Sequence, residues 1–238
     1  MLIRVLLAAI FAGVLAGVFA TAVQSYRVIP LILEAERYEG EGEIAGHSHS
    51  STPASEDSAV SSEEETWAPG GGGERLFYTG LTNIVVGVAF SLILTAAVLF
   101  LNQGMSMKAG LIWGLAGFVV FVLAPNFGLP PELPGMQAAE VLPRQIWWLA
   151  TVVLTATGLG LFAFKQGIVW MILGLVLITA PHLYGAPQPI SHESLVPANL
   201  AAEFVVATIV ASLLFWVFLG GVLGALFEKA MAKEEQSR

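Results

Sequence analysis

Six stretches of the sequence are apolar over nearly the length that a helix needs to cross a lipid bilayer. A spanning helix uses about 20 predominantly apolar residues. The stretches lie at 5–23, 79–101, 109–125, 146–164, 167–182 and 200–226. Because only 12% of the residues are charged and 56% are hydrophobic, an ordinary soluble domain is excluded. We therefore predict an all-α membrane protein with about six transmembrane helices.

The chain divides into four segments of different composition. Residues 1–24 hold the first predicted helix, residues 79–227 form a five-helix membrane core, and residues 228–238 are a charged tail. The first helix could also be a cleaved signal peptide, with a cleavage site at 20–22, but we favour a retained helix. The segment 25–78 contains 11 acidic residues among many Ser, Gly and Pro, and we expect a flexible outer loop there.

Two of the apolar stretches belong to a tandem repeat. Three residue pairs recur with an offset of 57 positions: Lys108 and Lys165, Gly110 and Gly167, Trp113 and Trp170. An Ala-Pro pair follows in each copy, at 124–125 and at 180–181, and is expected to break the helix. We predict two related helix pairs, at 79–125 and 146–182. In transporters, Gly- or Pro-interrupted segments at corresponding repeat positions point to the binding site.

The placement of charge predicts the orientation of the chain. If both termini are cytoplasmic, six of the ten Lys and Arg residues lie on the inner side. Inner loops carry an excess of these residues, so we place the N- and C-termini in the cytoplasm. All four His residues then face outside, and Trp147 and Trp148 lie at the outer interface as belt residues. The net charge of −8 argues against nucleic-acid binding.

A His-x-His motif within the acidic segment is the first candidate for metal binding. Neutral imidazoles bind Co, Ni, Cu and Zn, and carboxylates add harder oxygen ligands. His47 and His49, surrounded by acidic residues, could collect divalent cations at low affinity. A short motif of this kind can equally be a bystander in the loop.

The ends of the two repeat copies supply the other candidates. Four prolines between 125 and 134 remove backbone donors, and Glu132 among them is either a rigidly presented ligand or a solvated carboxylate at a turn. His182 occupies the position in the second copy that Asn126 occupies in the first. It is either a metal ligand or an interfacial side chain bonded to a loop carbonyl. His192 could add a further ligand, but we place it in open loop.

Other motifs narrow the function. The sequence has no P-loop and no Gly-x-Ser-x-Gly element, so we expect neither an ATPase nor another enzyme, and no bound cofactor. Near the span midplanes there is no Asp, Glu, Lys or Arg, which weakens a proton-coupled mechanism. Asn83 is expected to bond a neighbouring helix. Gly220, Gly221 and Gly224 could seat a partner helix.

Several motifs together carry a resemblance. These are Gly-Leu-Pro-Pro-Glu-Leu-Pro-Gly at 128–135, Arg-Gln-x-Trp-Trp at 144–148, Pro-His-Leu at 181–183 and the acidic loop with its His-x-His. With them the chain resembles, over essentially its full length, the CbtA-type cobalt transporter subunits of bacteria.

The resemblance implies a component of Co²⁺ uptake in the bacterial inner membrane, linked to cobalamin supply. Its usual partner would be a small single-span CbtB-type subunit with a His-rich end. We expect transport of the secondary type. The alternative is a non-conducting subunit that presents metal or supports assembly of a membrane complex.

Overall fold

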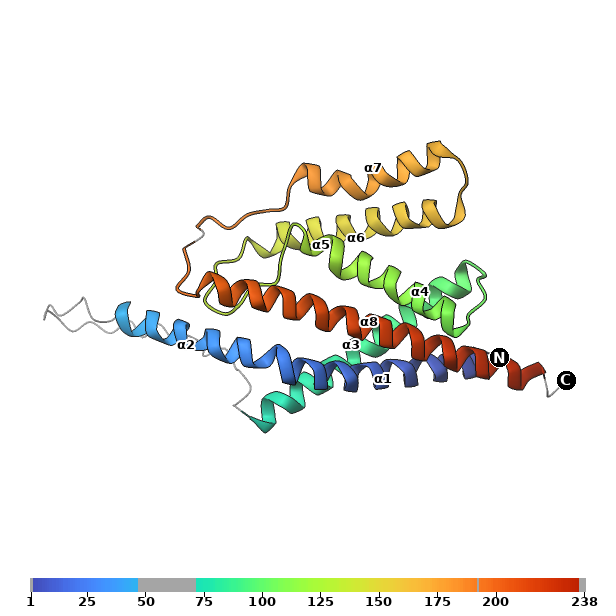
Figure 1. The fold of residues 1–238 in the computed structure, drawn as a ribbon, viewed down its shortest axis with the longest axis horizontal. Helices are drawn as coiled ribbons and strands as arrows, with labels where there is room; N and C mark the ends of the chain where they lie inside the picture. Colours follow the sequence, from blue (N-terminus) through green and yellow to red (C-terminus); the bar gives the residue numbers. More distant parts are fainter. Residues whose placement is uncertain (1, 47–71, 192, 236–238) are drawn as a thin grey trace, which may run out of the picture.

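The computed structural model describes residues 2–46, 72–191 and 193–235, and the regular secondary structure of this part of the chain is entirely helical, without strands (Figure 1). The elements are α1 (Leu2–Arg27), α2 (Ile29–Gly46), α3 (Gly73–Phe100), α4 (Met107–Phe118), the π-helix η2 (Val119–Leu123), α5 (Ala124–Asn126), α6 (Val141–Phe164), α7 (Ile168–Tyr184) and α8 (Ala198–Glu235). The prediction of an all-α membrane protein is confirmed.

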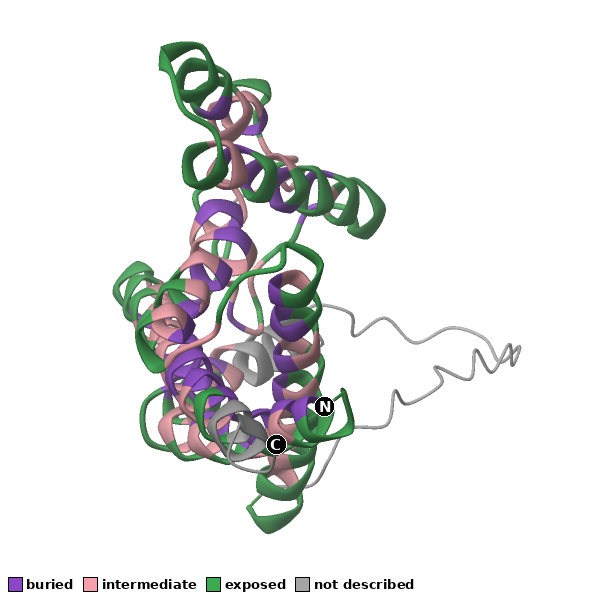
Figure 2. Cartoon of the chain, turned by 90° about the vertical axis from the view of Figure 1, so that its right-hand side faces the viewer, coloured by how far each residue is buried: buried purple, intermediate pink, exposed green. Residues whose placement is uncertain are grey.

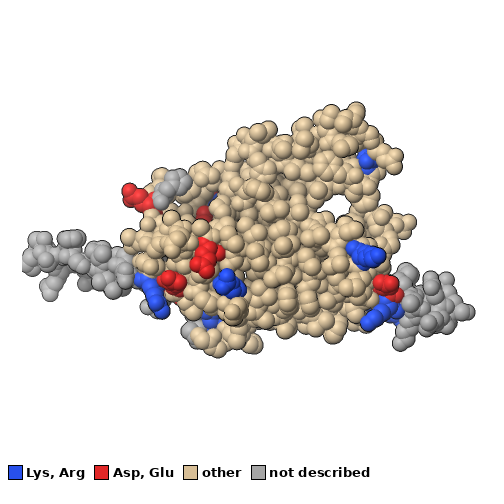
Figure 3. All heavy atoms as spheres, in the orientation of Figure 1, with Lys and Arg blue, Asp and Glu red and all other residues tan. Residues whose placement is uncertain are grey.

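Within the described residues, five helical units are long and apolar enough to cross a bilayer. They are α1, α3, the continuous unit α4–η2–α5, α6 and α8. The sixth predicted span corresponds to α7, which is apolar but has only 17 residues. At 1.5 Å per residue it covers about 25 Å of the roughly 30 Å hydrocarbon layer. Charged side chains gather at the two ends of the molecule, and the middle shows almost none (Figure 3). The chain is therefore a multi-pass membrane protein.

We name the two ends by their residues. The lysine end holds Lys108, Lys165 and Lys229 together with the first turn of α1. The proline end holds residues 124–136 and 181–191. Both chain termini lie at the lysine end, as Figure 1 shows.

Small residues allow α1 and α3 to pack in close contact. A Cβ atom added to Gly13 would overlap the backbone of Val88, and one added to Gly87 would overlap the backbone of α1. Near the proline end of this pair, the Asn83 amide donates hydrogen bonds to Thr21 Oγ1 (3.1 Å) and Gln24 Oε1 (2.9 Å). The expected helix–helix role of Asn83 is confirmed.

A second glycine seam joins α4 to α8. Gly110 and Gly114 face Gly220 so closely that a Cβ on any of them would overlap the opposing backbone. Gly224 meets the start of α4 in the same way. The expectation that the glycines of α8 seat a partner helix is wrong for Gly220 and Gly224, because α4 of the same chain already occupies them.

The remaining helices form a hairpin at the side of this bundle. The α6–α7 hairpin contacts the bundle through η2 and α5, and α7 packs along α6. Much of the hairpin surface is exposed, as the green ribbon at the top of Figure 2 shows. The predicted pair 146–182 is therefore a packed hairpin, whereas the predicted pair 79–125 is divided, with α3 mainly along α1 and α4 mainly along α8.

The described parts of segment 25–78 differ from the expected flexible loop. Residues 29–46 continue the direction of α1 as helix α2, which extends beyond the bundle (Figure 1). Arg75, near the start of α3, pairs with Glu36 of α2 at 2.7 Å. Helix α8 continues into the charged tail as far as Glu235.

Candidate functional site

The first repeat copy does not end at its proline. The N–H of Ala124 bonds to the carbonyl of Val119, five residues back, so a π-helical turn directly precedes Pro125. Proline lacks an N–H, and its ring displaces the carbonyl four residues before it. A widened turn at this point accommodates the ring, and the helix continues to Asn126 with Pro125 buried.

The second copy also continues past its proline. Pro181 lies inside α7, which runs on to Tyr184 and ends at Gly185 with a φ of 90° that glycine adopts without strain. The prediction that the Ala-Pro pairs break the two helices is therefore wrong. Both prolines sit in the last turns of their helices, where few hydrogen bonds remain to be lost.

Trp147 of α6 connects the ends of the two copies. Its indole N–H donates a 3.1 Å hydrogen bond to the carbonyl of Pro181. The indole ring also lies against Gly128, so that a Cβ added to Gly128 would overlap the ring. Only 5% of Trp147 is exposed. The interpretation of Trp147 as an interfacial belt residue is therefore wrong, since it is a buried bridge between the copies.

A cavity of about 480 Å³ opens where the copies meet. It is lined by Phe127, Gly128, Trp147, His182, Ala186 and Gln188. The half-buried His182 ring lies between two aromatic rings, with centroid distances of 5.8 Å to Trp147 and 6.2 Å to Phe127. Among the described residues of this lining, His182 is the one with an ionisable side chain.

The other candidates at this end lie outside the cavity lining. The Glu132 carboxylate pairs with the Arg144 guanidinium at 3.1 Å, with both side chains partly exposed. It is thus neither an unpaired ligand nor a freely solvated carboxylate. Asn126 is half-buried in the last turn of α5.

The structure brings together fewer potential ligands than a closed metal site needs. Across the described residues, no three His, Asp or Glu side chains are grouped so that they could hold a metal ion. His47, His49 and His192 lie outside the described residues. The metal-site prediction accordingly remains a prediction, with His182 as its best-placed member.

Sequence reasoning missed the aromatic lining of this cavity. Phe127 directly follows Asn126, and Trp147 lies in the Arg-Gln-x-Trp-Trp motif, but nothing in their spacing indicates that they meet. The repeat led to the same region of the molecule, because His182 directly follows the second Ala-Pro pair and Gly128 lies three residues after Pro125 of the first.

Comparison with known proteins agrees with the architecture. No curated protein and no solved structure matches the chain. A family model does match, over residues 2–228, and its description is probable cobalt transporter subunit (CbtA). Since this match covers nearly the whole sequence and every helix that could span a membrane, the chain belongs to the CbtA family of probable cobalt transporter subunits.

Proposed function

We propose that this chain is the integral membrane subunit of a secondary-type Co²⁺ uptake transporter in the bacterial inner membrane, linked to cobalamin supply. The proline end faces outside and both termini are cytoplasmic. A small single-span CbtB-type subunit is its partner. The observation that carries the proposal is the placement of His182 in a cavity between the corresponding ends of both repeat copies, where it is the one ionisable side chain among the described lining residues.

The chemistry of this cavity suits a transient contact with a cation. A neutral imidazole is a good ligand for Co²⁺ and neighbouring divalent ions. The Gln188 side chain, which also lines the cavity, offers an amide oxygen, and water would complete the coordination of a partly hydrated ion. A site with one strong ligand binds weakly, and a conducting site must release its ion as well as admit it.

The remaining predicted ligands act around this site. His47 and His49, with the acidic residues near them, concentrate the ion on the outer side. Glu132 exchanges its Arg144 partner for an approaching cation, because their ion pair is partly exposed and therefore weak. Asn126 and His192 lie close in sequence to the two ends and serve as secondary oxygen and nitrogen ligands.

One observation favours the alternative of a metal-presenting or assembly subunit. The central parts of the apolar stretches contain no Asp, Glu, Lys or Arg. Ion pathways usually place such residues inside the membrane. In this alternative the partner subunit supplies the pathway, and the His182 cavity only delivers the ion.

The test is accumulation of radiolabelled Co²⁺ in a bacterial host that lacks its own cobalt and nickel importers. The chain is expressed alone and together with the partner, at matched membrane abundance. We expect saturable uptake that His182→Ala reduces strongly. The matched control is Tyr184→Ala, because Tyr184 is 89% exposed on the same helix end and is not part of the cavity lining.

The outcomes separate the two functions. Saturable uptake by the chain alone supports a complete pathway. Uptake only with the partner favours the presenting subunit. Full uptake by His182→Ala in both settings contradicts the assignment of the site.

A further inference from the structure

A second and larger cavity lies at the opposite end of the molecule. Helix α6 contacts η2 and α5, which continue α4. From these contacts α6 and α4 diverge toward the lysine end (Figure 1). The wedge between them, closed on one side by the end of α3, holds a cavity of about 650 Å³. The space-filling view shows an opening at this position, with basic side chains on either side of it (Figure 3).

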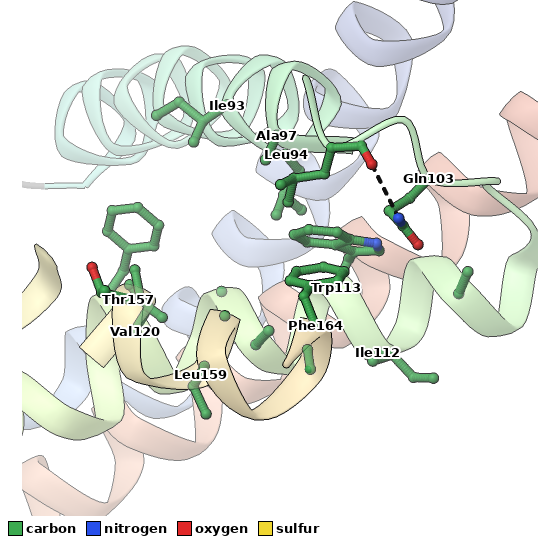
Figure 4. Close-up of a pocket in the computed structure, with 18 of the residues that line it drawn as sticks. Ile93, Leu94, Ala97, Gln103, Ile112, Trp113, Val120, Thr157, Leu159 and Phe164 are labelled. Atoms are coloured by element: carbon green, nitrogen blue, oxygen red, sulfur yellow. Dashed lines mark hydrogen bonds between the residues drawn. The ribbon is translucent and has the colours of Figure 1, made fainter. Parts of the chain in front are cut away.

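The lining of this wedge is almost entirely apolar. Figure 4 shows Trp113 and Phe164 turned into the cavity, with Ile93 and Leu94 on the side of α3. Thr157 and Gln103 are the polar side chains of the lining, and Gln103 is bonded to the carbonyl of Leu101. Since the described residues that line it include no His, Asp or Glu, they are unsuited to hold a metal ion. In a bilayer an open apolar wedge of this kind is filled by lipid or by another helix.

The dimensions favour lipid. On α4 and η2 the lining runs from Ala109 to Phe121, which corresponds to about 18 Å of helix, close to the roughly 15 Å depth of one bilayer leaflet. This depth matches that of a single acyl chain, which spans one leaflet.

Charge at the mouth identifies the kind of lipid. Lys108 precedes the lining residue Ala109, and Lys165 follows the lining residue Phe164. Both lysines therefore belong to the segments that border the opening, at the depth of the lipid headgroups. Lysine near a membrane surface attracts anionic headgroups. Lys165 is in addition held over the Trp170 ring, 5.7 Å from its centroid.

From these observations we infer that the wedge between α4 and α6 binds one acyl chain of an anionic phospholipid, whose headgroup lies between Lys108 and Lys165. The lipid fills the space between the hairpin and the bundle and joins the two on the side away from the His182 cavity. This site is independent of the metal chemistry at the proline end.

The test uses the full-length chain in nanodiscs of phosphatidylglycerol and phosphatidylcholine, with a trace of phosphatidylglycerol that carries a photoreactive acyl chain. After irradiation, the labelled peptides are mapped by mass spectrometry. We expect labels on the α4 and α6 residues that line the wedge. Excess phosphatidylglycerol should displace the label, whereas phosphatidylcholine should displace it poorly. Labels spread over all lipid-facing helices, or equal displacement by both lipids, would overturn the inference.

Two variants make the test specific. Gly160 lines the wedge, and an added Cβ there meets no atom within 4 Å, so Gly160→Leu fills the cavity without a clash. We expect it to lose most of the label, while Ala150→Leu on an exposed part of α6 retains it. Replacing Lys108 and Lys165 together by Gln should weaken the preference for phosphatidylglycerol by roughly tenfold or more. The control Lys229→Gln, at the same end, should retain that preference.

The same design detects a protein occupant. A photoreactive amino acid in place of Ala156 is irradiated in native membranes. We expect adducts with the mass of a phospholipid. A discrete adduct with the mass of a second polypeptide, or unchanged lipid labelling of Gly160→Leu, would reject the lipid assignment.

Discussion

The two repeat copies share a sequence pattern, yet they occupy very different surroundings. The first copy, α4 to α5, packs along α8 through glycines that bring the backbones into contact. The second copy, α7, packs along α6 and exposes much of its remaining surface. The copies become alike only at their proline ends, where Trp147 contacts both. The shared pattern thus leads to similar surroundings at the proline ends but not at the starts, since α4 begins before Lys108 whereas α7 begins after Gly167.

Breaking the glycine seam should have the largest effect. A side chain at Gly114 would overlap the backbone of α8 at Trp216, so Gly114→Leu must push α4 away from α8. Overpacking of this kind costs about 1–3 kcal/mol or more, and we expect the upper end because backbone blocks the side chain. Ala150→Leu, at an exposed position on α6 outside the wedge, is the control. Unfolding in mixed detergent micelles measures both, and equal stability of the two variants would contradict the seam.

A smaller effect is expected where the two copies meet. Trp147→Phe keeps an aromatic ring but removes the donor to the Pro181 carbonyl, which should cost about 1 kcal/mol. The released end of α7 should exchange its amide hydrogens faster, while the amides of α4 keep their rate. Trp148→Phe, at a more exposed position, is the control. Unchanged exchange in α7 would show that the indole hydrogen bond does not hold the second copy in place.

The smallest effect distinguishes the lysine ends of the copies. Lys165 lies over Trp170 in the second copy, and an exposed cation–π contact contributes about 0.5–1 kcal/mol. In the first copy Trp113 instead lines the wedge between α4 and α6. Lys165→Gln should therefore lower stability slightly and Lys108→Gln should not, when unfolding is followed by tryptophan fluorescence in neutral lipid. Equal losses would mean that the two lysine ends are equivalent after all.

Much of the membrane architecture could be predicted from the sequence because hydrophobic length is a local property. Each predicted span lies within a helix or differs from it by one residue, and the polar residue Asn83 bonds a neighbouring helix as expected. Helix α2 was missed because its acidic composition suggests disorder. Ala35 and the glutamates on either side of it are nevertheless good helix formers, and that propensity was the available clue.

The pairing of the helices could not be predicted in the same way. The small residues around Gly220 predict a close helix contact there. The pattern does not say whether the contacting helix is α4 or belongs to a separate subunit. Trp147 has the composition and position of an interfacial belt residue, and its burial depends on where the second copy ends. Helix α7 continues past Pro181, which lies in its last turn and whose carbonyl accepts a hydrogen bond from the Trp147 indole. Each of these outcomes depends on contacts between distant parts of the chain.

The most direct test of the central claim is calorimetric titration of the purified full-length chain with CoCl₂. A background with His47→Ala and His49→Ala removes the His-x-His motif, and His182 is then either retained or replaced by Ala. The account predicts one weak binding event that requires His182 and persists in the Tyr184→Ala control. Equal binding with and without the His182 imidazole would contradict the claim that the joined ends of the two repeat copies form the cobalt site.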